Sequence, residues 1–429
     1  MKIILRTCLF ILAVLQVNFG STPITKTLGG QYICTYEETP QNIIDELVDK
    51  KNGFGYVINQ HGVVEIVTIH GVIKTNHPLI CELIASPAFQ RLNKINQYGV
   101  CEYIKKPMGE PAAKIGYTRH QHSLGVLVII ARYSDKEGVY LLKEMISGLL
   151  HDISHTPFSH STDTLLAGGF LGVAYQDKTL HSFMKRHGIE AILNKYGIEV
   201  EDILPEKHSI LEQNSPNLCA DRIEYNIYAG YKEGHLNYKE IKTILDKLYF
   251  KDGKWGFHTE ESALIFAKIP IWNSQYRWGI PDSYITSRCL CDALHRAFCI
   301  GIITTEMFDC SLGDEEIWNK LKNSKDLRIL ERISQIEKPR DYFYLAKSNG
   351  ANTLYGITKF RGCVAMVGSQ SLNSLNVKFN KFYEKVQKEM KKGFSINPKK
   401  NVTPFDDLDP KVIDSYGVVN TVLKSEVTK

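Results

Sequence analysis

The chain has 429 residues, of which 43% are apolar and 23% are charged. This composition is typical of a folded globular protein with one large domain and a smaller one, or with a few modest domains. The formal charge of +5, from 52 basic and 47 acidic residues, is too small to indicate a nucleic-acid-binding protein, although it is compatible with a local basic pocket for an anionic substrate.

The first twenty residues have the layout of a signal peptide. Lys2 and Arg6 flank the start of an apolar run of about ten residues that ends near Val17, and small residues follow from Gly20. The run is too short for a transmembrane helix, which needs roughly 18 apolar residues, and no later stretch reaches that length. We therefore predict a signal peptide over residues 1–20, a secreted or periplasmic protein, and no membrane span after cleavage. The alternative is a buried N-terminal strand.

Short strands are predicted before residue 78 and helices after it. Residues 54–75 are rich in β-branched side chains and are interrupted by glycine, which is typical of short strands or a hairpin. From Pro78 onward, apolar residues recur at spacings of three and four. This periodicity, together with apolar runs, predicts helices at 78–97, 120–133, 139–151, 179–195, 208–230, 238–249 and 283–304.

The end of the chain mixes both kinds of pattern. A charged helix is predicted at 314–335, and strand-like runs occur at 341–345 and 363–367. The tail from residue 389 is rich in Lys, Asn and Pro, which is typical of a loop or a loosely packed extension.

Together these elements predict a mainly α-helical protein. A helical domain over 78–310 is preceded by short strands in residues 21–77 and followed by a small α+β region with a tail over 311–429. The chain contains no internal repeats and no low-complexity tracts, so nothing indicates a repeat architecture.

Two histidines and two aspartates have the types and order of a divalent-metal site. His122 and the adjacent pair His151 and Asp152 lie in two apolar predicted helices, and Asp221 lies in a third. Three helices that converge on one ion are a common way to build a metal site in a helical core. Imidazole and carboxylate ligands suit Fe, Mn, Zn or Mg and leave positions open for water and a phosphate oxygen. The set therefore predicts a metal-assisted phosphohydrolase.

Longer segments around these ligands resemble the HD-domain phosphohydrolases. Each residue alone has an ordinary explanation, because a single His or a His-Asp pair is frequent by chance. The resemblance rests on four segments that match in order and at close to family spacing, namely 69–71, 89–92, 119–126 and 151–163. Within the family they are most similar to the deoxynucleoside triphosphate triphosphohydrolases, whose animal members also carry a SAM domain. The resemblance implies an HD-domain helical catalytic core and the four metal ligands named above.

The resemblance also implies catalytic roles for several residues. His155 and Arg119 would hold the phosphates beside the metal ion. His160, steered by Asp163 and His181, is similar to the general acid that protonates the departing 5′-oxygen. For Asp163 the alternative is an ordinary carboxylate on a helix surface, and His181 belongs to a less regular part of the match.

Further residues match positions that contact the substrate in the family. Arg222 stands where the family has a phosphate-binding Lys, and both residues are cationic. Tyr225 matches a tyrosine that lines the sugar, and Gln97 matches a residue near the sugar 3′-hydroxyl. Arg277 and Tyr284 correspond more loosely to further phosphate and sugar contacts.

The implied roles agree with the chemistry of a triphosphate. Such a substrate has about four negative charges, which Arg119, Arg222 and the metal ion would neutralise. Metal coordination lowers the pKa of water from about 15.7 to near 7, and an imidazole can supply the leaving-group proton. Attack at the α-phosphorus would release nucleoside and inorganic triphosphate.

Four positions depart from the family pattern. Ala229 stands where the deoxynucleotide enzymes have an Asp that contacts the sugar 3′-hydroxyl, so sugar recognition differs. Ala85 and Asn93 occupy the positions of an Asp and an Arg that bind an activating guanine nucleotide in the animal enzymes, so activation of that kind is not expected. Ser182 replaces a Glu that often follows the third histidine.

Three functions are compatible with this sequence. The first is a metal-dependent hydrolase of (deoxy)nucleoside triphosphates, although the predicted export is unusual because the family works inside cells. The second is an HD phosphomonoesterase or phosphodiesterase that acts on another nucleotide, and the third is a silent nucleotide- or RNA-binding protein. The complete ligand set argues against the third, and the sequence leaves nucleic-acid binding open. Relatives assemble as tetramers or hexamers, so a homo-oligomer, such as a dimer, is expected.

Overall fold

The computed structural model of the protein describes residues 27–28, 32–44, 56–60, 62–108, 116–138, 141–162, 165, 175–304, 306–307, 312–346, 354–356, 360–399 and 401–405. The predicted signal peptide at 1–20 and the predicted catalytic residue Asp163 lie outside the described residues, so both stay predictions. Within these ranges, no helix combines the length and the apolar character that a membrane crossing needs.

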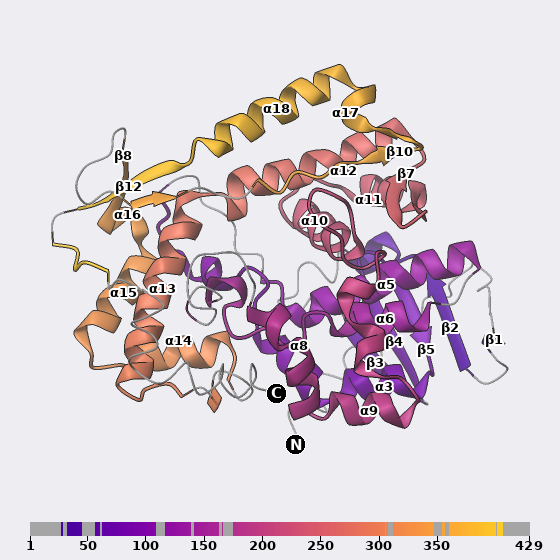
Figure 1. The fold of residues 1–429 in the computed structure, drawn as a ribbon, viewed down its shortest axis with the longest axis horizontal. Coiled ribbons are helices and arrows are strands. Elements are labelled where there is room, and N and C mark those ends of the chain that lie inside the picture. The colour runs from indigo at the N-terminus through magenta and orange to yellow at the C-terminus, as the bar shows by residue number, and fades with distance from the viewer. Residues whose placement is uncertain are drawn as a thin grey trace.

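A five-stranded antiparallel sheet forms the N-terminal part of the fold (Figure 1). Its strands lie in the order β1 (Thr27–Leu28), β2 (Tyr32–Glu37), β5 (Gly71–Thr75), β4 (Val63–Thr68) and β3 (Tyr56–Gln60). In the central pair Ile66 lies opposite Ile73, and both side chains are buried in the main hydrophobic core. The short strands predicted for residues 54–75 are therefore confirmed.

Three helices form the centre of the molecule: α5 (Arg119–Glu137), α6 (Leu142–Leu150) and α10 (Ala220–Lys232). Helix α5 packs against the sheet as well as against α6 and α10, and its residues 119–131 are all buried. It begins at a capping box in which Thr118 accepts from the Gln121 backbone N–H, and it ends at Gly138 in the left-handed conformation. The surrounding helices are α3 (Pro78–Ala85), α8 (Tyr175–Arg186), α9 (Ile189–Lys195), α11 (Tyr238–Lys247) and α12 (Glu260–Asn273).

Several helices that the periodicity predicts as continuous are interrupted. The segment 78–97 breaks at Ser86, which is extended because the next residue is Pro87, and it continues as α4 (Pro87–Gln90) and a 3₁₀ turn (Arg91–Lys94). The segment 179–195 breaks at Gly188, where φ is 78°. The charged helix predicted at 314–335 is two helices, α14 (Asp314–Lys322) and α15 (Leu327–Glu337).

The helix predicted at 208–230 is wrong in its first half. Residues 208–219 form turns, and helix α10 begins only at Ala220. Pro216 is compatible with this path, because proline lacks the N–H that a helix interior needs. As a consequence for the site, residues 211–219 form an irregular segment that passes beside the start of α10.

Some elements were absent from the sequence prediction. Helix α12 is buried on several sides and therefore lacks a polar stripe of helical period. Two short strands follow α11, β6 (Leu248–Lys251) and β7 (Lys254–Phe257), and they form a sheet with β10 (Met366–Val367) and β11 (Gln370–Ser371). The prediction of a loose tail from residue 389 is wrong for residues 389–398, because the chain continues from α18 (Val377–Lys391) into β12 (Phe394–Pro398). The part of the predicted tail after residue 405 lies outside the described residues.

The C-terminal region is not separated from the helical domain. Helix α13 (Pro281–Cys299) packs against α14 and α15 in a second hydrophobic core. Strand β12 lies between β8 (Phe343–Ala346) and β9 (Leu354–Gly356) in a three-stranded sheet. Helices α17 (Leu372–Leu375) and α18 contact α12, along which α18 runs in Figure 1. Residues on both sides of the predicted boundary at 310 therefore share one core.

Candidate metal centre and active-site pocket

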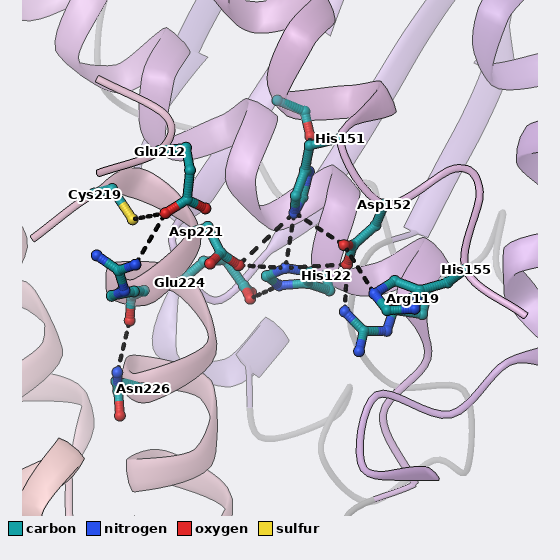
Figure 2. A network of polar contacts seen from close by, with 12 residues as sticks. Arg119, His122, His151, Asp152, His155, Glu212, Cys219, Asp221, Glu224 and Asn226 are labelled. Carbon is teal, nitrogen blue, oxygen red and sulfur yellow. Dashed lines mark hydrogen bonds and ion pairs between the residues drawn. The ribbon is translucent and has the colours of Figure 1, made fainter. Parts of the chain in front are cut away.

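The four predicted metal ligands meet at one point between three helices (Figure 2). His122 is on α5, His151 and Asp152 follow α6, and Asp221 is in the first turn of α10. The His122 Nε2 atom lies 3.2 Å from His151 Nε2, 3.0 Å from an Asp221 oxygen and 3.5 Å from an Asp152 oxygen. The His151 Nε2 atom lies 3.7 Å from the same Asp221 oxygen. The structure thus brings all four side chains together, although they span 99 residues between His122 and Asp221.

Adjacent side chains of a helix point in directions about 100° apart, so His151 and Asp152 need a local reason to reach one target. Helix α6 ends at Leu150, and the chain turns at His151. The His151 Nδ1 atom lies 2.8 Å from the backbone oxygen of Gly148, so Nδ1 carries the proton and Nε2 presents its lone pair to the centre. Gly148 also lets α6 approach α5, because a Cβ there would lie 2.9 Å from Ile130.

A buried carboxylate that the sequence prediction missed holds the other histidine. The Glu224 Oε2 atom lies 2.5 Å from His122 Nδ1, and its second oxygen contacts His70 Nε2 at 2.9 Å and the Tyr117 hydroxyl. Gly125 provides the space, since a Cβ there would lie 2.3 Å from the Glu224 carboxylate. Helical spacing could have predicted this contact, because Glu224 lies one turn after Asp221 on the same face of α10.

The surrounding carboxylates decide the charge of His122 when no metal is bound. Burial disfavours a charged imidazole, but Glu224, Asp221 and Asp152 outweigh this penalty and raise the pKa of His122 to about 10. A divalent cation in the same place would compensate the same carboxylates. The residues fit such an ion: two imidazole nitrogens and two carboxylates converge, and the outer nitrogen of each imidazole has an acceptor.

This charge balance predicts that metal binding displaces a proton. Because His122 is protonated below a pKa of about 10, we expect the affinity for Mn²⁺ or Zn²⁺ to rise with pH. The proton also stabilises the metal-free fold, fully below the usual histidine pKa of 6.5 and progressively less as the pH rises through about 10. Titration calorimetry in buffers of different ionisation enthalpy would count the released protons. Affinity that is independent of pH between about 6 and about 9 would contradict this assignment.

The metal centre opens into a cavity of about 490 Å³. Among the residues that line it are the ligands His151, Asp152 and Asp221 and six of the other predicted site residues, which are Gln97, Arg119, His160, Arg222, Tyr225 and Arg277. A cavity of this size suits a ligand of nucleotide dimensions. The structure therefore gathers most of the predicted set around one space, while the role of each residue stays a prediction.

Arg119 and His155 lie beside Asp152, on its side away from His122 (Figure 2); Arg119 lines the cavity, and His155 is buried next to it. An Arg119 N–H donates to Asp152 at 2.5 Å and another donates to Ser159 at 3.0 Å. The His155 ring is buried, with Nε2 3.3 Å from Asp152. Burial, followed by the charge of Arg119, lowers the pKa of His155 to about 3, so this imidazole is neutral at physiological pH. His160 is exposed to the cavity, and its ring lies edge-on to His155 at 4.9 Å.

The loop between these two histidines is held by residues from distant elements. Phe158 and Ser159 both have positive φ, at 65° and 52°, which costs conformational energy in side-chain-bearing residues. Asp314, at the start of α14, accepts the Phe158 N–H at 2.7 Å, and Arg91 donates to the backbone oxygens of residues 153 and 155. The path of residues 155–160 therefore depends partly on Asp314, which belongs to the C-terminal region.

Of the predicted site residues that the structure describes, His122 and His155 are buried beside the centre without lining the cavity, whereas His181 and Tyr284 lie away from it. His181 is about half exposed and lies 3.3 Å from Glu201, because helix α8 directs Leu180 and Phe183 into the core and His181 to solvent. Tyr284 packs against Phe394. Helix α13 instead presents Ser283 and Ser287 to the cavity, one turn apart on a single face.

Glu212 and Arg361 also line the cavity and were absent from the predicted site. The Glu212 carboxylate lies 2.9 Å from Arg222, and burial, followed by the charge of Asp221, raises the pKa of Glu212 to about 7. Glu212 also forms a group with Cys219 and Asp221 whose potential ligand atoms lie within 4.8 Å of one another. Glu212 was missed because a helix was predicted over 208–230, and in a straight helix Glu212 would lie far from Asp221.

Comparison with known proteins places the chain in a family. The profile of the HD domain matches residues 119–248, which contain the four predicted ligands. The uncharacterized protein YdhJ of Bacillus subtilis is 31% identical over 263 residues, which are 59% of this chain and 74% of YdhJ. The metal-dependent phosphohydrolase cns2 of Cordyceps militaris is 28% identical over 297 residues, or 66% of this chain and 81% of cns2.

More distant matches agree. The human deoxynucleoside triphosphate triphosphohydrolase SAMHD1 is 32% identical over 226 residues, which are 46% of this chain and 34% of that protein. A phosphohydrolase from Bacteroides thetaiotaomicron has the same fold, with a TM-score of 0.57 and 19% identity over 81% of this chain and 100% of that chain. The predicted mainly α fold and the predicted divalent-metal cofactor are thereby confirmed, and the chain belongs to the HD-domain family of metal-dependent phosphohydrolases.

Proposed function

We propose that this phosphohydrolase cleaves (deoxy)nucleoside triphosphates into nucleoside and inorganic triphosphate. The observation that supports the proposal most directly is the gathering of arginines beside the metal centre. Four arginines, which are Arg119, Arg222, Arg277 and Arg361, line one cavity together with the ligands. Guanidinium groups bind phosphates in pairs of parallel hydrogen bonds, so the wall suits a substrate with several phosphates.

The side chains can divide the reaction among themselves. When bound, a divalent ion would supply nucleophilic water at neutral pH and charge neutralisation at the phosphorus. Arg119 holds Asp152 in position by donating to its carboxylate, and it places a positive charge at the cavity wall beside the metal ligands. His160 stands in the cavity as an exposed imidazole and can protonate the departing 5′-oxygen. His155 is buried and neutral, so it can orient neighbouring groups without adding charge.

The sugar contact of the related deoxynucleotide enzymes is not available here. Ala229 is fully buried in the main core and does not line the cavity. The positions that correspond to the activator site, Ala85 and Asn93, are exposed on the surface. The proposal therefore specifies the phosphate chemistry and includes both ribose and deoxyribose substrates. This missing contact also favours the second candidate, an HD phosphomonoesterase or phosphodiesterase that acts on another nucleotide.

Product analysis separates these functions. The purified protein, loaded with Mn²⁺ or Fe²⁺, is incubated with a panel of nucleotides, and the products are resolved by ion-exchange chromatography. We expect nucleoside and inorganic triphosphate in equal amounts, because attack at the α-phosphorus breaks the bond to the 5′-oxygen. Release of orthophosphate or of a nucleoside monophosphate would overturn the proposal in favour of the second candidate. Nucleotide binding without turnover under all metals would indicate a silent binding protein.

A further inference from the structure

A segment from the C-terminal region forms part of the cavity wall. Arg361 and Cys363 line the cavity next to residues of the HD domain. The backbone N–H of Arg361 donates to the Ser274 hydroxyl at 3.1 Å, and the N–H of Val364 donates to the backbone oxygen of Pro216 at 2.9 Å. Cys363 is buried in the main core. The segment is thus fixed at both ends, between the end of α12 and the chain that precedes α10.

The other arginines of the wall already have carboxylate partners. Arg119 donates to Asp152, the Arg222 guanidinium contacts Glu212, and the Arg277 guanidinium contacts Glu233. The Arg361 side chain is exposed toward solvent and the cavity, and within the described ranges no carboxylate or other acceptor pairs with it. An anionic ligand would therefore meet an uncompensated cation at this position.

The position of Arg361 relative to the metal centre follows from its neighbours. Tyr225 and Arg361 line the same cavity, and the charge of Arg361 opposes the rise that burial causes in the pKa of the Tyr225 hydroxyl. The Tyr225 ring in turn lies 6.3 Å from the His122 ring. Arg361 therefore shares one cavity wall with Tyr225, in a segment bonded to the chain that leads into Asp221.

We propose that Arg361 binds the terminal phosphates of a polyphosphate substrate whose α-phosphorus lies at the metal centre. This inference rests on the proposed function and assigns to the C-terminal region the selection of triphosphates over monophosphates. A single phosphate at the metal would leave Arg361 unpaired, whereas a longer chain reaches it. The guanidinium offers two parallel N–H donors to a phosphate, which a lysine cannot reproduce.

Direct binding of inorganic anions tests the assignment without requiring turnover. The full chain, loaded with Mn²⁺, is titrated with inorganic tripolyphosphate and, separately, with orthophosphate in a calorimeter. For Arg361→Gln we expect the Kd of tripolyphosphate to rise about 10-fold or more, as the loss of a charge-assisted hydrogen bond implies, and the Kd of orthophosphate to stay unchanged. Arg361→Lys should recover part of the loss. In turnover assays of nucleoside triphosphates, KM should rise while kcat changes little.

Arg340→Gln is the matched control, because Arg340 is an exposed arginine of the C-terminal region outside the cavity. The inference is overturned if Arg361→Gln binds tripolyphosphate as tightly as the unaltered chain, if it weakens both anions equally, or if Arg340→Gln has the same effect. Failure of the unaltered chain to bind tripolyphosphate would also overturn it. If binding behaves as expected but no nucleotide yields inorganic triphosphate, the proposed function alone fails.

Discussion

Replacing His151 and Asp152 together with alanine is expected to abolish metal binding and phosphohydrolase activity. The change removes two of the four converging ligands and leaves the buried Arg119 guanidinium without its carboxylate partner. A catalytic metal ion contributes several kcal/mol of charge stabilisation in the transition state. Activity should therefore fall by about a thousand-fold or more. Metal content per chain, measured by mass spectrometry after gel filtration, gives the direct readout.

A second histidine–carboxylate pair provides the matched control. Glu144 lies on α6, the helix that precedes His151. Its carboxylate lies 3.7 Å from the His208 imidazole, and neither residue lines the cavity. His208→Ala with Glu144→Ala should keep stoichiometric metal and activity while it loses some stability. Circular dichroism of both double variants establishes that they fold. Stoichiometric metal in the folded His151→Ala, Asp152→Ala protein would refute the assigned centre.

Glu224→Gln is expected to weaken metal binding about 10- to 100-fold, the usual effect of removing the group that orients a ligating histidine. The carboxylate is 1% exposed and accepts from His122, His70 and Tyr117. Glutamine keeps the shape but presents an N–H₂ group to at least one of these donors. Without the negative charge the pKa of His122 should fall from about 10 toward its usual value, so metal binding should become less dependent on pH.

Competition with a chelator at several pH values measures both effects for Glu224→Gln. Asp292→Asn is the control, because Asp292 is an equally buried carboxylate on α13 that pairs with Arg328 and Arg332 of α15. Thermal unfolding should show that both variants lose stability, whereas only Glu224→Gln should lose metal affinity. Equal metal affinity and equal pH dependence for Glu224→Gln and the unaltered chain would show that Glu224 has no part in the metal centre.

The fold was predictable where side chains repeat with a regular period. Helix α5 lies close to its predicted bounds, and strands β4 and β5 lie within the segment 54–75 for which short strands were predicted. Prediction failed where the period is absent or misleading. Helix α12 is apolar on several faces, and the apolar residues of 208–219 lie in turns whose contacts are long-range, such as the Trp255 indole N–H that donates to the backbone oxygen of Ile210.

For the site, the types of the metal ligands and their chemistry were predictable from the residues and their order. A metal centre needs particular donor atoms, and this makes the four ligands His122, His151, Asp152 and Asp221 recognisable. The residues next to them in the chain belong to the same motif. The order and surroundings of the ligands were sufficient to indicate an HD phosphohydrolase before any contact was visible.

Which other side chains reach that centre depends on tertiary packing. It placed His181 on the solvent face of α8 and brought Glu224, Glu212 and Arg361 to the ligands or the cavity. The physical reason is that a side chain's direction depends on which face of its helix is buried, and the approach of a distant segment depends on packing across the whole core. Neither property is local, so the pattern around a motif does not contain it.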